Sequence, residues 1–327
     1  MLRDAMFLTW ERHRRTRGLA RLLELRLHEI VTPGPRVRRY WRQLRESLRV
    51  LRRERPTIIF VQNPSLVLCA FVLGWRAITR PKPIVIIDAH NEAVEPFVNK
   101  SRLIRAVARW EIRSADFTIV TNRFLADKVT VLGGRSLVLP DPLPEVAPAT
   151  SYALKPGEPV RVLVVATYAK DEPIVAILEA AKQLLGQFEF KFTGNFRKLP
   201  EAVLATAPPN VAFLGFLRDD EYWSAMRDAH AVLDLTLMDD CLVCGAYEAV
   251  ALGRPMVLSD TRALTEYFRQ GALHCSARPE AITAALRQLR DEYEQLMLGV
   301  TALRPRLKAE WTAHADALAS WVSRARA

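Results

Sequence analysis

The feature of this sequence that most constrains its fold is a series of short, continuous apolar segments, each ending in polar residues and followed by a helical segment. In the first half of the chain these segments are "AMFLTW" (5–10), "TIIFVQNP" (57–64), "PIVIIDAHN" (83–91), "DFTIVTN" (116–122) and "SLVLPDP" (136–142). Strands that are apolar along their whole length are buried on both faces, and their alternation with helices is typical of parallel sheets. The pattern therefore predicts a doubly wound α/β domain.

The same alternation restarts after residues 142–159, a stretch that is rich in proline and alanine and lacks periodicity. The apolar segments of the second half are 160–166, 188–194, 211–216, 231–237 and 255–260. We therefore predict an α/β protein with two Rossmann-like domains, the first over 1–145 and the second over 160–305, joined by a linker over 146–159.

The positive charge of the chain is concentrated near its N-terminus. The formal net charge is +11, and residues 1–60 alone contain 16 arginines, no lysine and six acidic residues. Within this region, residues 36–54 have the apolar spacing of an amphipathic helix whose other face is almost entirely arginine. Such a face suits a phosphate-bearing ligand or an anionic membrane surface, or is simply solvated. No helix-turn-helix, zinc-finger or RNP pattern is present, so we do not expect nucleic acid as a partner.

Cysteine usage and hydropathy indicate where the protein works. The four cysteines are few for 327 residues and imply no disulfide framework, which favours the reducing cytoplasm. The charged residues Arg3 and Asp4 argue against a secretory signal. The longest apolar run, residues 65–75, is about half the ~20 residues that a membrane span requires. We therefore expect a cytoplasmic protein that can lie peripherally at the inner face of the plasma membrane.

Polar residues at the ends of strands are the first candidates for chemistry, because ligands of open α/β sheets bind beyond the carboxyl ends of the strands. The segment "DDCLVCGAYEAVALGRP" (239–255) follows such a strand and carries Asp240, Gly245 and Glu248. Two carboxylates on either side of a strand-to-helix turn can accept hydrogen bonds from vicinal hydroxyls, and the helix N-terminus between them attracts phosphate. The combination predicts a site for a sugar nucleotide.

This segment and its continuation resemble the C-terminal signature of the group-1 retaining glycosyltransferases, a Glu-x7-Glu motif followed by Ala, Gly, Pro and Ser-Asp. The matching positions are Asp240, Glu248, Ala249, Gly253, Pro255, Ser259 and Asp260. The resemblance implies the GT-B fold, in which two Rossmann-like domains face each other across a cleft and a last helix, here 306–327, completes the first domain. It also implies that Glu248 binds the nucleotide ribose and that Asp240 contacts the transferred sugar. Because the first acid is Asp rather than Glu, the identity of that sugar is open.

The resemblance points to further donor-binding residues. Lys170, after the apolar segment 160–166, is the available cation for the donor diphosphate, while the arginine usual in the family is missing there. Gly194 and Arg197 in "TGNFRK" are alternatives, and Phe216 lies in a segment that resembles the family's base-contacting loop. A diphosphate can be stabilised by such cations and a helix N-terminus. We therefore expect neither a metal nor a cofactor besides the nucleotide sugar, which is a co-substrate.

In the first domain, "IIDAHNE" places Asp88 and His90 just beyond a predicted strand. Relatives often have a histidine here that faces the donor sugar, so the resemblance implies that His90 assists a retaining transfer. In an inverting transfer, Asp88 or His90 would instead be the candidate general base.

The loop "ERHRRTRG" (11–18), where relatives usually have a glycine-rich loop, supplies the candidate acceptor residues Glu11, Arg12, His13 and Arg15. The acceptor of the family generally enters from this domain, so these residues predict a phosphate-bearing acceptor. A polyprenyl-diphosphate-linked glycan in the synthesis of a bacterial surface polysaccharide would fit. The arginine face of residues 36–54 would then lie against anionic lipid headgroups.

Two other functions fit parts of the sequence. A catalytically inactive or epimerase-like relative would account for the shortened first acid and the missing arginine. Cys241 and Cys244 have the CxxC spacing of an oxidoreductase, but the Trp-Cys-Gly-Pro context is absent. A zinc site would need two more ligands, for which His274 and Cys275 are the only pair. A glycosyltransferase of the hexosyltransferase type is the function that the sequence favours.

Overall fold

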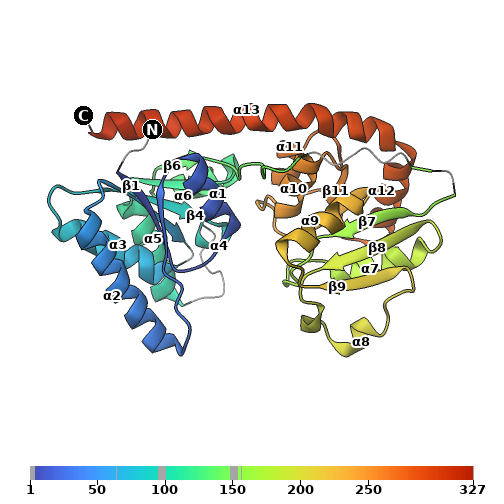
Figure 1. Ribbon diagram of the computed structural model, residues 1–327, viewed down its shortest axis with the longest axis horizontal. Helices are drawn as coiled ribbons and strands as arrows, with labels where there is room; N and C mark the ends of the chain where they lie inside the picture. Colours follow the sequence, from blue (N-terminus) through green and yellow to red (C-terminus); the bar gives the residue numbers. More distant parts are fainter. Residues whose placement is uncertain (1–3, 64, 95–100, 148–153, 156, 327) are drawn as a thin grey trace. The chain divides into compact units, whose positions relative to one another are not determined.

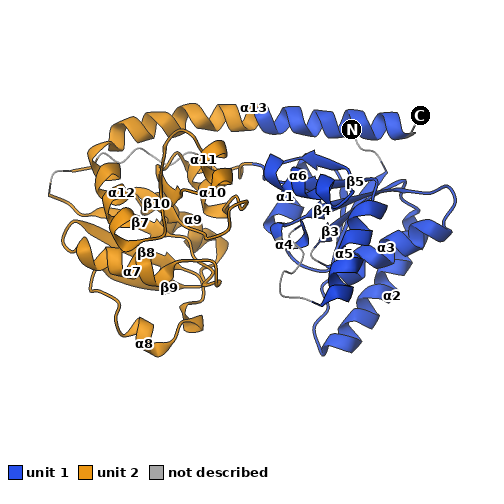
Figure 2. Cartoon of the chain, turned by 180° about the vertical axis from the view of Figure 1, so that it is seen from behind, with its two compact units in different colours: residues 1–142, 310–327 blue, residues 143–309 orange. Residues whose placement is uncertain are grey.

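The computed structural model describes residues 4–63, 65–94, 101–147, 154–155 and 157–326. The chain divides into two compact units, unit 1 of residues 1–142 and 310–327 and unit 2 of residues 143–309 (Figure 2). The predicted linker, 146–159, falls partly outside the described residues, because 148–153 and 156 are not among them.

The described residues of unit 1 form one parallel sheet with the strand order β2-β1-β3-β4-β5-β6 (Figure 1). Its strands are β1 (Ala5–Thr9), β2 (Arg26–Glu29), β3 (Ile58–Asn63), β4 (Ile84–Ala89), β5 (Phe117–Val120) and β6 (Ser136–Val138). Its helices are α1 (Arg14–Leu22), α2 (Arg36–Glu54), α3 (Leu66–Ile78), α4 (Asn91–Val94), α5 (Arg102–Ser114), α6 (Arg123–Val131) and the end of α13 (Tyr293–Arg326).

Both faces of this sheet are covered, which is why its strands read as unbroken apolar runs. Successive side chains of a strand point to opposite faces. Met6 and Leu8 of β1 pack on one face, in a buried cluster that includes Leu51 of α2 and residues of α3. Ala5 and Phe7 pack on the other face with residues of α1 and the end of α13.

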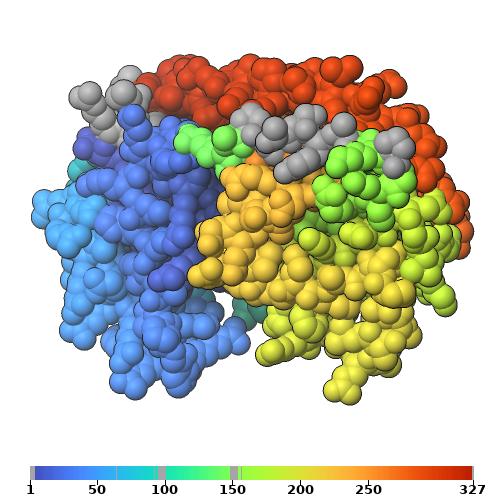
Figure 3. Space-filling view, turned by 45° about the vertical axis from the view of Figure 1, so that its right-hand side comes forward, coloured from blue at the N-terminus to red at the C-terminus, as the bar shows by residue number. Residues whose placement is uncertain are grey.

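The described residues of unit 2 also form one parallel sheet, in the order β12-β11-β10-β7-β8-β9. Its strands are β7 (Val160–Val164), β8 (Phe188–Thr193), β9 (Val211–Gly215), β10 (Ala231–Asp234), β11 (Met256–Ser259) and β12 (Ala272–Cys275). Its helices are α7 (Ile174–Gln183), η1 (Phe196–Lys198), α8 (Glu201–Leu204), α9 (Asp219–Asp228), α10 (Cys244–Leu252), α11 (Arg262–Tyr267), α12 (Pro279–Asp291) and the start of α13. The segment between β8 and β9, which holds η1 and α8, protrudes from this unit (Figures 1 and 3).

The predicted fold class, two Rossmann-like α/β halves, is confirmed. Two elements differ from expectation. β12 was not predicted, because its four residues "ALHC" are too few to show a periodicity; among the described strands, it pairs only with β11. The last helix begins at Tyr293 rather than 306 and runs through Pro305, a residue that ordinarily ends a helix.

Within the described residues, no helix is both long enough and apolar enough to span a lipid bilayer.

Candidate functional site

The candidate site of unit 2 lies where the strand order of its sheet reverses. β7 and β10 are parallel neighbours there, and β8 and β11 lead away from them on opposite sides. The loop after β7 spans 165–173 and the loop after β10 spans 235–243. A hydrogen bond joins the two loops, because the Thr236 hydroxyl donates to the Asp171 carboxylate at 2.8 Å. Ligands of open α/β sheets bind at such a reversal, beyond the carboxyl ends of the strands.

Asp240, the first acid of the motif, lies in the loop after β10 and is only 4% exposed. Arg262 at the start of α11 holds its carboxylate at two points. The arginine Nε–H donates to Oδ1 at 2.6 Å, and Nη2–H donates to Oδ2 at 2.9 Å. A two-point pairing of this kind fixes the plane of the carboxylate and places a positive charge beside it. Any sugar hydroxyl that binds Asp240 therefore meets an acid whose orientation is already set.

Glu248, the second acid, lies within α10 and is 4% exposed. Its carboxylate accepts a hydrogen bond from the Tyr222 hydroxyl of α9. All residues of α10 from Gly245 to Leu252 are buried, so the helix gives Glu248 a rigid base. The carboxylate is therefore positioned to accept further hydrogen bonds, the role that the motif gives it toward a ribose.

Gly245 is at the first turn of α10 because no larger residue fits there. A Cβ at this position would lie 2.5 Å from Oδ2 of Asp234 and 2.9 Å from Cγ2 of Val165. The Gly245 N–H instead donates to Asp234 Oδ2 at 2.9 Å. Burial raises the pKa of the Asp234 carboxyl well above its usual value, and the charges of Glu172, Glu248 and Asp171 raise it further.

In the loop after β7, a carboxylate side chain binds backbone N–H groups of the same loop. The Glu172 carboxylate accepts hydrogen bonds from the Thr167 N–H at 3.0 Å and from the Tyr168 N–H at 2.7 Å. Tyr168 adopts a left-handed conformation, with φ of 57°. The backbone donors at the end of β7 thus bind a carboxylate of the chain itself, close to where the resemblance places a donor diphosphate.

Gly194, one of the predicted donor residues, brings the loops after β8 and β7 into contact. Its φ is +84°, and a Cβ there would lie 1.9 Å from the carbonyl oxygen of Ala166. The Nζ of Lys198 donates to the Thr167 carbonyl at 2.7 Å across the same contact. Glycine is required here by both the conformation and the close approach.

The other predicted donor residues are exposed, but they lie at different distances from the strand reversal. Lys170 lies in the loop after β7 and Arg197 lies in η1. Phe216 follows β9, at the far edge of the sheet, and is 88% exposed. Lys170 is therefore near the strand reversal, whereas Phe216 stands two strands away from β7.

Cys241 and Cys244, the CxxC pair, precede and begin α10, and neither forms a disulfide bond with a described residue. In the described part of the chain, no group of three or more His, Cys, Asp or Glu side chains has the arrangement of a metal site. Cys275, considered as a zinc ligand, is buried in β12, and burial raises the pKa of its thiol to about 12.

In unit 1, Arg15 of α1 is buried and does not face solvent. Its Nε–H donates to Asp88 Oδ1 at 2.9 Å, its Nη2–H donates to the Leu139 carbonyl at 2.9 Å, and Nη1–H donates to Asp141. Asp88, at the end of β4, is fully buried. Arg15 and Asp88 therefore form an internal ion pair. This pairing was not expected from the predicted roles, acceptor binding for Arg15 and general-base chemistry for Asp88.

His90 follows β4 and packs beside His13, with the two ring centroids 4.5 Å apart. Burial lowers the pKa of His90 to about 4, against an opposing effect of the Asp88 charge. His90 is therefore neutral at physiological pH. The remaining acceptor candidates, Glu11 and Arg12, are exposed and line a pocket of unit 1.

Three residues that shape the site of unit 2 were missed from the sequence, namely Tyr222, Arg262 and Asp234. None belongs to the motif. Each is recognised only by its hydrogen-bond partner, which is distant along the chain. Only Asp234 has a feature visible in the sequence, because it is an acidic residue inside the apolar run "AVLDLTL".

Comparison with known proteins gives one family and many structures. Residues 172–320, a little under half of the chain, match a family model described as glycosyl transferase-like. A search among curated protein sequences found no match. Among solved structures, sucrose-phosphate synthase from Thermosynechococcus elongatus is similar with a TM-score of 0.70 and 15% identity, covering 98% of this chain and 88% of that one.

Two other solved structures extend the comparison. HepE of Anabaena, in complex with UDP and glucose, has a TM-score of 0.70 and 12% identity, covering 97% of this chain and 91% of its own. A UDP-N-acetylglucosamine 2-epimerase from Listeria monocytogenes has a TM-score of 0.55 and 15% identity, covering 91% and 82%. At these identities the likeness is one of fold.

Proposed function

We propose that this chain is a glycosyltransferase of the group-1, GT-B type, which transfers a sugar from a nucleotide-sugar donor to a phosphate-bearing, lipid-linked acceptor. The family model described as glycosyl transferase-like and the shared fold support this enzyme class. The observation that carries the donor half is the placement of Asp240 and Glu248 on either side of the N-terminus of α10, at the strand reversal of unit 2. HepE, which has the same fold, is in complex with UDP and glucose.

The donor contacts follow from the chemistry of each group. Glu248 accepts hydrogen bonds from the ribose hydroxyls while Tyr222 holds its carboxylate in place. The diphosphate lies at the N-terminus of α10, where the N–H groups and the helix dipole favour negative charge. Lys170 and Arg197 add charge from the neighbouring loops. Asp240, oriented by Arg262, accepts a hydroxyl of the sugar that is transferred.

The proposed transfer retains the anomeric configuration and needs no metal or additional cofactor. Its leaving group is a nucleoside diphosphate, which cations and a helix N-terminus can stabilise as the sugar departs. His90, neutral because it is buried, accepts or donates a hydrogen bond to position the sugar and carries no charge of its own.

The acceptor half of the proposal is supported by charge. Unit 1 contains α2, whose exposed side chains are mostly arginine, and anionic lipid headgroups attract such a surface. This charge supports the proposal that the protein acts at the inner face of the plasma membrane, where it would extend a polyprenyl-diphosphate-linked glycan for a surface polysaccharide.

Isothermal titration with UDP, ADP and GDP tests the donor site, together with assays of transfer from the matching nucleotide sugars. We expect one diphosphate to bind, and we expect Glu248→Gln to weaken it at least tenfold. The matched control is Glu294→Gln, an exposed acid of α13 in the same unit, which should leave binding unchanged. Failure of every nucleoside diphosphate to bind the wild-type protein would refute the proposal.

An epimerase is the second candidate, because the 2-epimerase of Listeria shares the fold and the expected arginine after β7 is missing. The two are distinguished by incubating each nucleotide sugar in D2O without an acceptor. Deuterium at the sugar C2, read by NMR, would indicate epimerisation, whereas the proposed transferase leaves C2 protonated.

A further inference from the structure

A pocket of about 690 Å³ opens in unit 1, beyond the carboxyl ends of neighbouring strands β2, β1 and β3. It lies at the strand reversal of this sheet, where β1 stands between β2 on one side and β3 on the other. Its walls come from the loops after these strands, from α2, and from the starts of α3 and α5. They are Trp10, Glu11, Arg12, Val31, Thr32, Arg36, Arg39, Tyr40, Gln43, Ser65, Leu66, Val67 and Ile104.

One side of the pocket is cationic. Arg12, Arg36 and Arg39 line it, against the single acid Glu11 among the described lining residues. Arg36 and Arg39 stand over the Tyr40 ring, with 5.9 and 5.5 Å from guanidinium carbon to ring centroid. Within the described part of the chain, none of the three guanidinium groups forms a hydrogen bond or an ion pair. Their donors therefore remain available to a phosphate.

Gln43 contributes a buried hydrogen-bond acceptor that has no donor among the described residues. It is 3% exposed and lines the pocket from α2. Its Nε2 donates to the carbonyl of Ile30 at 2.9 Å and to that of Trp10 at 3.4 Å, which fixes the orientation of the amide. Its Oε1 is buried and accepts no hydrogen bond from any described residue. A buried acceptor without a donor is costly, so a ligand hydroxyl that reached Oε1 would remove that cost.

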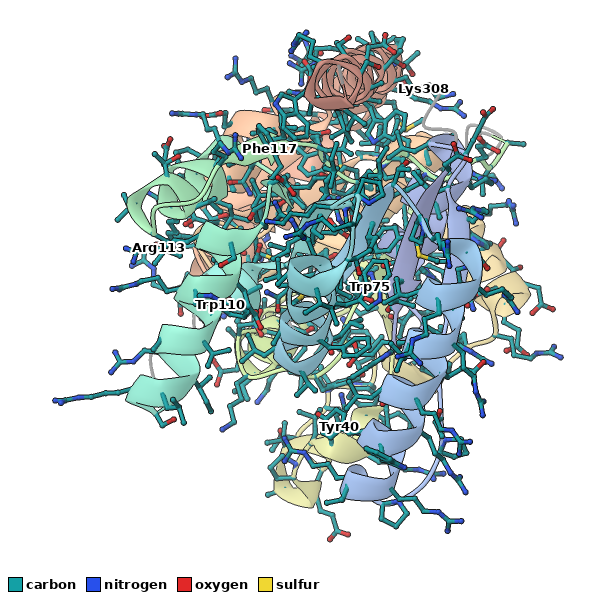
Figure 4. All side chains as sticks on the ribbon, turned by 90° about the vertical axis from the view of Figure 1, so that its left-hand side faces the viewer. Tyr40, Trp75, Trp110, Arg113, Phe117 and Lys308 are labelled. Carbon is teal, nitrogen blue, oxygen red and sulfur yellow. The ribbon has the colours of Figure 1, made fainter. Side chains whose placement is uncertain are left out.

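The rim of the pocket is apolar. Val31 and Val67 line it and are 47% and 41% exposed. Val37, Trp41 and Leu103 adjoin lining residues in the sequence and are 84%, 68% and 74% exposed. Figure 4 shows α2, α3 and α5 side by side on one face of unit 1, with Tyr40 near one end of α2. Val31 and Val67 are therefore exposed apolar side chains at the pocket itself, where an apolar part of a ligand can contact them.

We propose that this pocket binds the glycosyl phosphate or diphosphate headgroup of an amphiphile, with its apolar chain leaving over the rim. Arg12, Arg36 and Arg39 bind the phosphate, and Gln43 accepts a sugar hydroxyl. The inference rests on the proposed function, since the amphiphile is its acceptor. It moves acceptor binding from the buried Arg15 to arginines of α2, a helix that the sequence assigned to the membrane surface as a whole.

The first test is titration of the full chain with farnesyl diphosphate, inorganic pyrophosphate and farnesol. We expect farnesyl diphosphate to bind at least tenfold more tightly than either fragment. The variant Arg36→Ala/Arg39→Ala should weaken its binding tenfold or more, while the matched pair Arg42→Ala/Arg45→Ala, exposed on the same helix outside the pocket, should leave it unchanged. Equal losses of farnesyl diphosphate binding in the two double variants would show a general effect of charge and would contradict binding in the pocket.

Vesicles distinguish the acceptor from bulk lipid. With phosphatidylglycerol vesicles, the variant Arg42→Ala/Arg45→Ala should lose at least as much binding as the variant Arg36→Ala/Arg39→Ala. Loss of vesicle binding in the pocket variant alone, without loss of farnesyl diphosphate binding, would assign the pocket to lipid headgroups and overturn the proposal.

A second pair of probes tests the hydroxyl. α-Glucose 1-phosphate should bind more tightly than inorganic phosphate in the wild type, and the variant Gln43→Met should remove that preference while still binding inorganic phosphate. Equal binding of the two probes by the wild type would contradict the role of Gln43. Titration with UDP separates this inference from the donor site. If UDP binds and farnesyl diphosphate does not, the pocket assignment alone fails.

Discussion

Arg262 binds Asp240 through two hydrogen bonds of 2.6 and 2.9 Å, so the shortened first acid of the motif is oriented by a residue 22 positions later. Removing the arginine in Arg262→Ala leaves a buried carboxylate without this partner, and such a loss costs about 1–3 kcal/mol. We expect a lower midpoint of thermal unfolding and a transfer rate reduced at least tenfold. Arg262→Lys should recover part of the stability but less of the rate, because lysine cannot pair at two points. Equal rates in the two variants would show that the orientation of Asp240 is unimportant.

The hydroxyl of Tyr222 donates to Glu248, and its removal tests whether that contact positions Glu248 for the proposed binding of the ribose. A hydrogen bond to a charged group is worth ~1.5–3 kcal/mol, so Tyr222→Phe should weaken nucleotide binding about tenfold or more. The control is Tyr293→Phe, which removes a 3.2 Å hydrogen bond to the His230 carbonyl in the same unit. Titration calorimetry should show weaker binding in the first variant only.

Gly245 and Gly74 predict opposite effects of the same substitution. Gly245→Ala places a Cβ 2.5 Å from the Asp234 carboxyl, and overpacking of this kind costs about 1–3 kcal/mol. Gly74→Ala in α3 has no atom within 4 Å of the new Cβ, and alanine favours a helix by roughly 0.5–1 kcal/mol over glycine. Unfolding midpoints should fall in the first variant and stay or rise in the second. A rise in both would contradict the close packing at α10.

Glu111 of α5 predicts a pH-dependent stability. It is fully buried, and neither carboxyl oxygen accepts a well-formed hydrogen bond from a described residue. Burial raises its pKa from 4.5 to about 8, with only partial opposition from the backbone of Ala70. Below pH 4.5 the carboxyl is protonated in both folded and unfolded chains. As the pH rises from there to 8, the unfolded chain ionises first, so the folded state loses stability.

The variant Glu111→Gln removes this titration. Its urea midpoint, followed by tryptophan fluorescence, should exceed that of the wild type by an amount that grows between pH 5 and 8. The corresponding difference in the free energy of unfolding should reach several kcal/mol, since each unit of difference between the folded and unfolded pKa is about 1.4 kcal/mol. A difference that does not vary with pH would contradict a protonated, buried Glu111.

Local pattern was sufficient for the architecture of this protein. Apolar runs such as "TIIFVQNP" and "PIVIIDAHN" identified β3 and β4 because a strand covered on both faces must be apolar along its length. The arginine and leucine spacing of residues 36–54 predicted α2 with its observed bounds. The motif that ends at Asp260 resembles the signature of the group-1 glycosyltransferases, and it lies within residues 172–320, which match the family model described as glycosyl transferase-like.

Tertiary structure alone decided which polar groups are available. Arg15 and Asp88 are 73 residues apart and become an internal ion pair only because β1 and β4 lie in one sheet. Arg36 and Arg39 look like other arginines of α2, yet they line a pocket with Gln43, whereas Arg42 and Arg45 do not. The periodicity of a helix states which side chains share a face, but burial and pairing depend on the elements that pack against it. Those elements come from distant parts of the chain, so their contacts leave no local signal.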